Sequence, residues 1–184
     1  MICAGIDAGS RTIKVVLIDG EKLTLLGSGV VDQGIEQERL AEQLLRDVLN
    51  KAGIGRDEIG SIVATGYGRK LFKEADDSIS EITANAIGAF EEGKAVGGVH
   101  TIINIGGQDS KAIQIDDRGN VSNFAMTDKC AAGTGRFLDV AARNLEIDLE
   151  ELGDYHFKGT RAPLTINSTC AVFAESEIIG LLAK

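Results

Sequence analysis

The stretch TIINIGGQDSK, residues 101–111, consists of an apolar run, two glycines, and a polar segment that leads into the next apolar run. This order predicts a strand, a tight glycine turn and a second strand. The stretch ICAGIDAGSRTIK, residues 2–14, repeats the order nearer the N-terminus. We therefore predict an α/β chain made by duplication, with two similar lobes and the two glycine turns facing each other across a cleft.

Each glycine turn belongs to a series of elements in the order strand, turn, strand, strand and helix. Strands are expected at 2–7, 12–19, 22–31, 59–64, 101–105, 110–116 and 121–126, and helices at 36–52, 81–92 and 132–145. Leucines at helical spacing mark the first helix, and Gly53 ends it. One short strand and a helix at Cys170 complete the second series. The expected lobes are residues 1–98 and 99–184.

The composition excludes several classes of protein. A net charge of -9 argues against nucleic-acid binding, which requires a basic surface. No segment approaches the roughly 18 uncharged apolar residues that a membrane span needs. The N-terminus has no basic region followed by a long apolar run, so no secretory signal is expected. Three cysteines in such a chain predict reduced thiols and a cytoplasmic protein.

The two glycine turns carry the same kinds of group: backbone N–H groups freed by glycine, a hydroxyl and a lysine. Such a set can cradle phosphate oxygens. Asp7 and Asp109 are expected to hold Mg²⁺ or to orient a water molecule. Ordinary hairpins use the same residue types, so a purely structural turn is the alternative. The turn residues are Asp7, Gly9, Ser10, Arg11, Thr12 and Lys14 in the first, and Gly106, Gly107, Gln108, Asp109, Ser110 and Lys111 in the second.

Two cysteines, Cys130 and Cys170, each precede a helix-forming run, and each is expected at a helix start. The positive end of the helix dipole favours a thiolate and its ligation of a metal. Two ligands are too few for a four-cysteine cluster, so two chains would have to share one. The alternative is a pair of buried, unreactive thiols. The third cysteine, Cys3, lies in a strand pattern and is expected in the core.

Three segments, 106–111, 127–138 and 168–177, resemble the activators of 2-hydroxyacyl-CoA dehydratases and the ATPase subunits of benzoyl-CoA reductase. These proteins belong to the superfamily of acetate and sugar kinases, heat-shock chaperones and actin. The resemblance covers essentially the whole chain. It implies a duplicated actin-like ATPase fold.

The resemblance also implies a function, that of an ATP-driven electron donor. The family pattern is a homodimer with one 4Fe–4S cluster between its subunits, here held by Cys130 and Cys170 of each chain. ATP or ADP with Mg²⁺ would bind the two turns and Gly133, Thr134 and Gly135, with Asp7, Gln108 and Asp109 as catalytic residues. The electron would come from a ferredoxin or flavodoxin and pass to an acceptor dehydratase or reductase. Because residues 133–135 follow Cys130, loss of the γ-phosphate could move a ligand helix.

The chain departs from the family pattern at three places. Asn104 stands where an aspartate is usual, and it cannot neutralise a metal ion. Residues 84–85 are Ala-Asn where Cys-His is frequent. The chain ends at Lys184, where family members continue, so we expect an incomplete second lobe, a weaker ATP site and an uncovered apolar surface at Ile178, Ile179, Leu181 and Leu182.

Two other functions compete with this interpretation. A small-molecule kinase of the same superfamily would have no use for Cys130 and Cys170. A non-catalytic regulatory fragment would be consistent with Asn104 and with the chain end at Lys184. The presence of an iron–sulfur cluster, of a phosphorylated product, or of neither separates the three.

Overall fold

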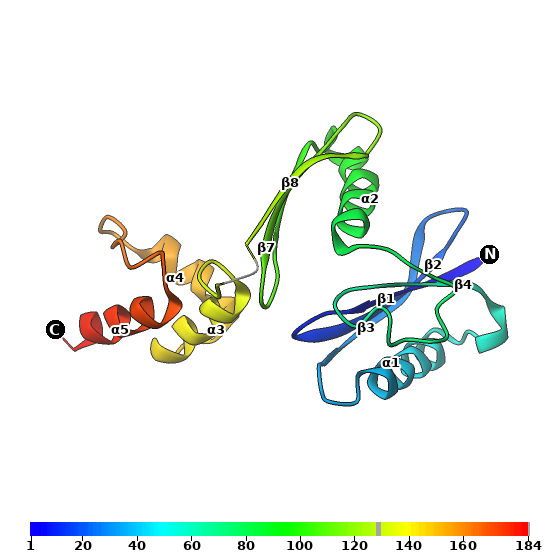
Figure 1. Ribbon diagram of the computed structural model, residues 1–184, viewed down its shortest axis with the longest axis horizontal. Coiled ribbons are helices and arrows are strands. Elements are labelled where there is room, and N and C mark those ends of the chain that lie inside the picture. The colour runs from blue at the N-terminus through cyan, green and yellow to red at the C-terminus, as the bar shows by residue number, and fades with distance from the viewer. Residues whose placement is uncertain (128–129, 184) are drawn as a thin grey trace. The chain divides into compact units, whose positions relative to one another are not determined.

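The computed structural model describes residues 1–127 and 130–183 and is a mixed α/β structure with two sheets (Figure 1). Asp128 and Lys129 of the first cysteine motif, and Lys184, lie outside the described residues. Contacts divide the chain into two compact units. Unit 1 comprises residues 1–100 and 115–122, and unit 2 comprises residues 101–114 and the described residues from 123 onward.

The elements follow the predicted order closely. The strands are β1 (Ile2–Ala8), β2 (Thr12–Asp19), β3 (Thr24–Asp32), β4 (Ile59–Thr65), β5 (Asp77–Ser78), β6 (Thr101–Ile105), β7 (Ser110–Ile115) and β8 (Val121–Thr127). The helices are α1 (Gln37–Ala52), α2 (Glu81–Gly93), α3 (Gly135–Asn144), α4 (Leu152–Lys158) and α5 (Ala171–Leu182), with 3₁₀ turns η1 (Arg56–Glu58), η2 (Lys94–Val96) and η3 (Leu149–Glu151).

The core of unit 1 lies between α1 and one face of the sheet with strand order β3-β2-β1-β4-β5. Alternate residues of β2, namely Ile13, Val15 and Leu17, are fully buried in it. The helix contributes a buried stripe that includes Leu45 and Val48. Figure 1 shows α1 running along the β1–β4 sheet. The alternating apolar residues of the strands therefore pack against the apolar stripe of α1 and form one layer.

Both helices of unit 1 have ends that the sequence specifies. Gly53 follows α1 in a left-handed conformation, φ 68°, and its N–H donates to the carbonyl of Asn50. Such a glycine satisfies carbonyl groups that a helix end otherwise leaves open. Ser80 caps α2 by accepting a hydrogen bond from the Thr83 N–H. These ends confirm the predicted bounds to within one residue.

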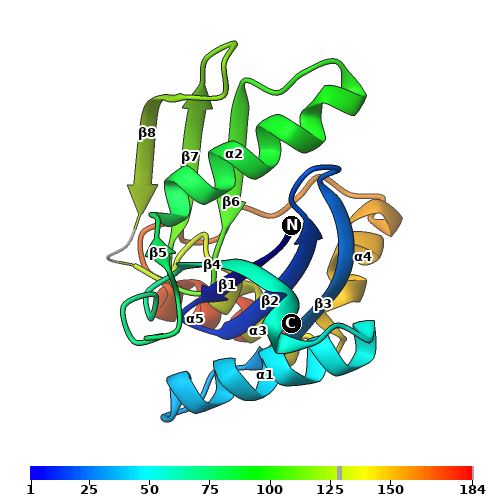
Figure 2. The same cartoon turned by 90° about the vertical axis from the view of Figure 1, so that its right-hand side faces the viewer.

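The sheet of strands β6, β7 and β8 repeats the first three strands of unit 1 (Figure 2). In both sheets the first strand pairs antiparallel with the second. In unit 1, β1 also pairs in parallel with β4, which places the end of β4 beside the first turn. The predicted repeat of elements is therefore present in the structure.

Two predictions about unit 2 were wrong and one was confirmed. The helix after Cys130 begins at Gly135 instead of Ala132, because Gly133 has φ 76° and interrupts helical backbone. Asp148 and Glu151 form a capping box, as expected of a helix start, and helix α4 follows it. Residues 159–169 contain no strand.

Helix α5 packs against α3 and presents much of its remaining surface to solvent. Of the four residues expected to be uncovered, Ile179, Leu181 and Leu182 are exposed and Ile178 is half-buried. The exposed side chains of α5 also include Val172 and Phe173. This helix is therefore apolar on faces that nothing in the described part of the chain covers.

Candidate functional site

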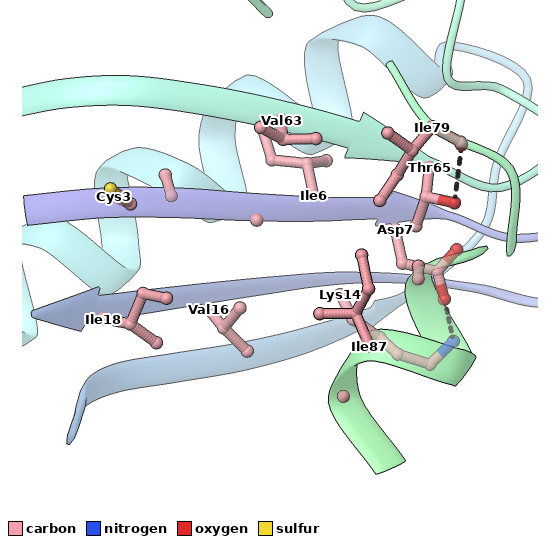
Figure 3. A pocket seen from close by; sticks show the side chains of 14 residues that line it. Cys3, Ile6, Asp7, Lys14, Val16, Ile18, Val63, Thr65, Ile79 and Ile87 are labelled. Atoms are coloured by element: carbon pink, nitrogen blue, oxygen red, sulfur yellow. Dashed lines mark hydrogen bonds and ion pairs between the residues drawn. The ribbon is translucent and has the colours of Figure 1, made fainter. Parts of the chain in front are cut away.

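The first glycine turn joins β1 to β2 and is closed by a hydrogen bond from the Gly9 N–H to the Thr12 carbonyl, 3.1 Å. Asp7 and Lys14 stand opposite each other in the strand register. The Lys14 ammonium therefore donates to Oδ2 of Asp7 at 2.8 Å, and both side chains are partly exposed. Figure 3 shows this pair at one end of the sheet face. Ser10 is half-buried in the turn, and Arg11 is exposed.

The same turn holds an unusual carboxylate oxygen. Oδ1 of Asp7 is buried and accepts no hydrogen bond from the described residues. Two amide oxygens, of Gln33 and Gln37, share this condition. A buried acceptor without a donor is costly and needs a physical explanation.

An apolar cavity of about 520 Å³ lies on the sheet face opposite α1 (Figure 3). Its floor consists of strand residues such as Cys3, Val16 and Val63, and Ile87 of α2 borders it. Asp7, Lys14 and Thr65 supply polar groups to its lining. Cys3 therefore lines a cavity and is not part of the core between the sheet and α1. The sequence does contain a sign of this cavity. Strand β2 has apolar residues on both of its faces, which is typical of a strand that is covered on both sides.

The second glycine turn joins β6 to β7 and repeats the geometry of the first. The Gly106 N–H donates to the Asp109 carbonyl at 2.8 Å, as Gly9 does to Thr12. Asn104 stands opposite Lys111 in the strand register, as Asp7 stands opposite Lys14. The two turns are therefore equivalent position by position.

In the second turn, the carboxylate that pairs with the lysine comes from a residue of the turn and not from the preceding strand. Because Asn104 carries no charge, Lys111 forms its ion pair with Asp109 instead, at 2.5 Å. Both side chains of this pair are almost fully buried. Asp109 was expected to hold a metal or orient a water, and in this structure it neutralises Lys111. Gln108 is exposed at the turn, and Gly107 is half-buried.

Residues 133–135 lie directly against the second turn. The Ser110 hydroxyl donates to the Gly133 carbonyl at 2.6 Å, and the Gly135 N–H donates to the Gly106 carbonyl at 2.8 Å. A side chain at Gly135 would come within 3.2 Å of that carbonyl oxygen. Thr134, between them, is fully buried and donates through its hydroxyl to the Ala131 carbonyl. The structure thus brings this predicted segment and the second turn together.

The two cysteines of unit 2 lie on neighbouring segments. The Cys130 thiol donates to the carbonyl of Thr169 at 3.4 Å, and Thr169 immediately precedes Cys170. Both cysteines are unbridged and partly buried. Cys170 caps α5, as predicted. Cys130 was expected at a helix start and lies instead in a turn before α3, whose cap is Thr134.

The loop before Cys170 is fixed by a residue that the sequence did not single out. The Asn167 side-chain oxygen accepts hydrogen bonds from the N–H groups of Thr169 and Cys170, each at 2.9 Å. The Asn167 N–H in turn donates to Glu177 on α5. An Asn three residues before a helix start is a recognisable turn signal, and only the fold shows that it holds this cysteine.

One chain by itself brings together few side chains that could bind a metal ion in the part that the structure describes. Within residues 1–127 and 130–183, no three His, Cys, Asp or Glu side chains gather so that they could hold a metal ion. Two neighbouring, partly exposed thiols fit half of a four-thiolate site. Among the described residues, no helix has the length and apolar character to cross a membrane.

Comparison with known proteins gives consistent matches. Residues 4–184 match the sequence model of the BadF/BadG/BcrA/BcrD ATPase family. The 2-hydroxyisocaproyl-CoA dehydratase activator of Clostridioides difficile is 40% identical over 188 residues, covering 100% of this chain and 67% of that protein. The activator of lactoyl-CoA dehydratase from Anaerotignum propionicum is 44% identical over 185 residues, with 100% and 69% coverage. The chain thus spans about two thirds of the length of these relatives.

Solved structures confirm the fold. The 2-hydroxyisocaproyl-CoA dehydratase activator from Clostridium difficile with bound ADPNP superposes with a TM-score of 0.87 at 39% identity, covering 100% of this chain and 66% of the other. A ROK hexokinase from Thermus thermophilus, 16% identical, has a TM-score of 0.52 over 87% of this chain and 70% of its own. The predicted actin-like α/β fold is therefore correct.

Proposed function

The chain belongs to the BadF/BadG/BcrA/BcrD ATPase family, and on this premise we propose that it is an ATP-hydrolysing iron–sulfur protein that delivers a low-potential electron. The acceptor would be a 2-hydroxyacyl-CoA dehydratase or a related CoA-ester reductase. Relatives of about 40% identity are activators of such dehydratases, and one subunit of the benzoyl-CoA reductase of Thauera aromatica is 32% identical. A ferredoxin or flavodoxin is the proposed upstream donor, and the cytoplasm the proposed compartment.

One observation carries the proposal: in unit 2, two sets of hydrogen bonds, linked through the short chain segment 130–135, join a phosphate-type turn to the segments of both cysteines. It runs from Gly106 and Ser110 to Gly133 and Gly135. It continues from the Cys130 thiol to Thr169, the neighbour of Cys170. A kinase would need the turn and would have no use for the thiols. A family member that couples a nucleotide to electron transfer would use both.

The cysteines fit the proposed cluster because two chains would supply four thiolates. Cys130 and Cys170 of each copy would hold the cluster at the interface of a homodimer. A 4Fe–4S cluster with four thiolate ligands supplies one-electron transfer at low potential. The N-terminus of α5 at Cys170 would stabilise negative charge there. Asn167 would keep the Cys170 loop in one conformation.

Each of the two turns, taken by itself, carries groups that suit the phosphate oxygens of ATP or ADP. Their closing bonds use the N–H groups of Gly9 and Gly106, which leaves the tip residues Ser10, Arg11, Gly107 and Gln108 to approach phosphate oxygens. Lys14 adds a positive charge on the partly exposed side of the first turn. Asp7 is the proposed carboxylate for Mg²⁺, because its Oδ1 accepts no hydrogen bond from the described residues, whereas Asn104 is uncharged and Asp109 is buried with Lys111.

An electron-transfer assay tests the proposal. The anaerobically purified and reduced chain is mixed with ATP and, in turn, with the dehydratases for 2-hydroxyisocaproyl-CoA, lactoyl-CoA and (R)-2-hydroxyglutaryl-CoA. We expect ATP, and not ADPNP, to support dehydration by at least one of them. The proposal is contradicted if all three stay inactive in assays in which their own activators work.

A further inference from the structure

The carboxylate of Asp7 is held from two sides. From β2, Lys14 pairs with Oδ2. From β4, Thr65 stands beside Asp7 in the parallel register, so the next residue, Gly66, lies against the end of β1. The Gly68 N–H donates to the Ala8 carbonyl at 2.9 Å and ties this loop to β1.

The backbone of Gly66 occupies the space around the unpartnered oxygen. A Cβ atom at Gly66 would lie 2.6 Å from Oδ1 of Asp7 and 2.5 Å from the Ala8 carbonyl oxygen. Real Cβ atoms do not approach other atoms so closely, so a side chain here would displace the carboxylate or the loop. The Arg69 guanidinium donates to the Gly66 carbonyl at 2.9 Å and holds the loop in place.

Backbone conformation alone does not explain this contact. Gly66 has φ 91°, a conformation that favours glycine. Gly97 in the same unit has φ 94°, yet a Cβ atom there would meet nothing within 4 Å. The two glycines have similar φ angles and differ in what surrounds them. Gly66 is distinguished by its contact with Asp7.

We infer that Gly66 is a positioning residue for Asp7 in the first phosphate turn. Its bare backbone keeps the carboxylate against Lys14 and holds Oδ1 away from protein donors. An incoming Mg²⁺ ion, or a water that it carries, would offset the cost of this unpartnered oxygen. The inference rests on the proposed function, since it assigns a further segment of unit 1, residues 65–69, to the Mg²⁺ site proposed at the first turn.

The test compares Gly66→Ala with Gly97→Ala in the full chain. Calorimetry measures ATP affinity with and without Mg²⁺, and thermal unfolding reports stability. We expect both variants to melt earlier, because both strain the backbone. Only Gly66→Ala should lose the Mg²⁺-dependent gain in ATP affinity, by tenfold or more. Equal Mg²⁺ dependence in the two variants would overturn the inference.

Two further variants separate Asp7 from general damage. In an Asp7→Ala background, Gly66→Ala should change the Mg²⁺ dependence by less than twofold, and a further tenfold loss would show that Gly66 does not act through Asp7. Arg69→Ala leaves Gly66 in place and loosens its loop, so a smaller loss, about threefold, is expected even if Gly66→Ala fails to fold. No loss would count against the inference. If the wild-type chain binds no ATP, the proposed function itself fails.

Discussion

At the scale of single residues, Ser110 connects two parts of the molecule that the proposed function requires to communicate. Its hydroxyl bonds to the Gly133 carbonyl, three residues beyond Cys130. A second direct bond between these segments uses backbone atoms of Gly135 and Gly106, which substitution leaves in place. Ser110 is therefore the position where a side-chain change tests communication between the turn and the cysteines.

Replacement of Ser110 by alanine should separate ATP hydrolysis from electron transfer. Loss of one hydrogen bond costs about 1 kcal/mol of stability, and the turn can still close through Gly106. We expect hydrolysis within about twofold of wild type and a fall of severalfold in electrons delivered per ATP. Ser176→Ala is the matched control, since it removes a hydroxyl bond to Val172 inside α5. An unchanged ratio in Ser110→Ala would exclude this route.

The sequence allowed some of these residues to be predicted and left others out. Both glycine turns and both cysteines were identifiable, because their residue types and order are local properties. The partner of Lys111 was not, since Asp109 takes that role only in the folded hairpin. The contact of Gly66 with Asp7 joins segments that are far apart in sequence, so it has no local signal. Asn167 does carry a local turn signal, and only the fold shows that it holds Cys170.

At the scale of elements, the repeat was predictable and its irregular parts were not. In β2, buried and exposed residues alternate from Ile13 to Leu17, which identifies the segment as a strand. The segment 130–134 contains small residues that are compatible with a helix, and the left-handed Gly133 decides against it. Helix α4 is short and lacks a buried face, so periodicity gave no sign of it.

The turn between β7 and β8 is held by hydrogen bonds to one carboxylate, that of Asp116. The Asn120 side chain and the N–H groups of Asn120 and Arg118 all donate to the carboxylate of Asp116. These bonds, the Asn120 side chain first, hold the pKa of Asp116 below its ordinary value. The carboxylate therefore stabilises the turn above the pKa it has in the unfolded chain, and this contribution is lost as the pH falls through its lowered folded pKa.

Asn120→Ala should raise the pKa of Asp116 toward its ordinary value. Asp19 provides an internal control, because the N–H groups of Lys22 and Glu21 lower its pKa independently of Asn120. Carboxyl carbon chemical shifts followed by NMR between neutral and strongly acidic pH measure both groups. A pKa of Asp116 that does not change in the variant would show that the Asn120 side chain does not set it.

At the scale of the whole molecule, the proposed function requires each chain to offer half of a cluster site. It spans about two thirds of the length of the activators that it matches, and both cysteine segments fall inside that part. The described residues of one chain contain no group of three metal ligands. The central claim is therefore about two molecules: two copies share one 4Fe–4S cluster through Cys130 and Cys170.

Native mass spectrometry of the anaerobically purified chain tests this claim most directly. We predict a species of two chains with four irons and four sulfides, the content of one cubane cluster. Cys130→Ala and Cys170→Ala should each remove the cluster, whereas Cys3→Ala, in the cavity of unit 1, should retain it. A cluster on a single chain, or a full cluster in Cys130→Ala, would contradict the account.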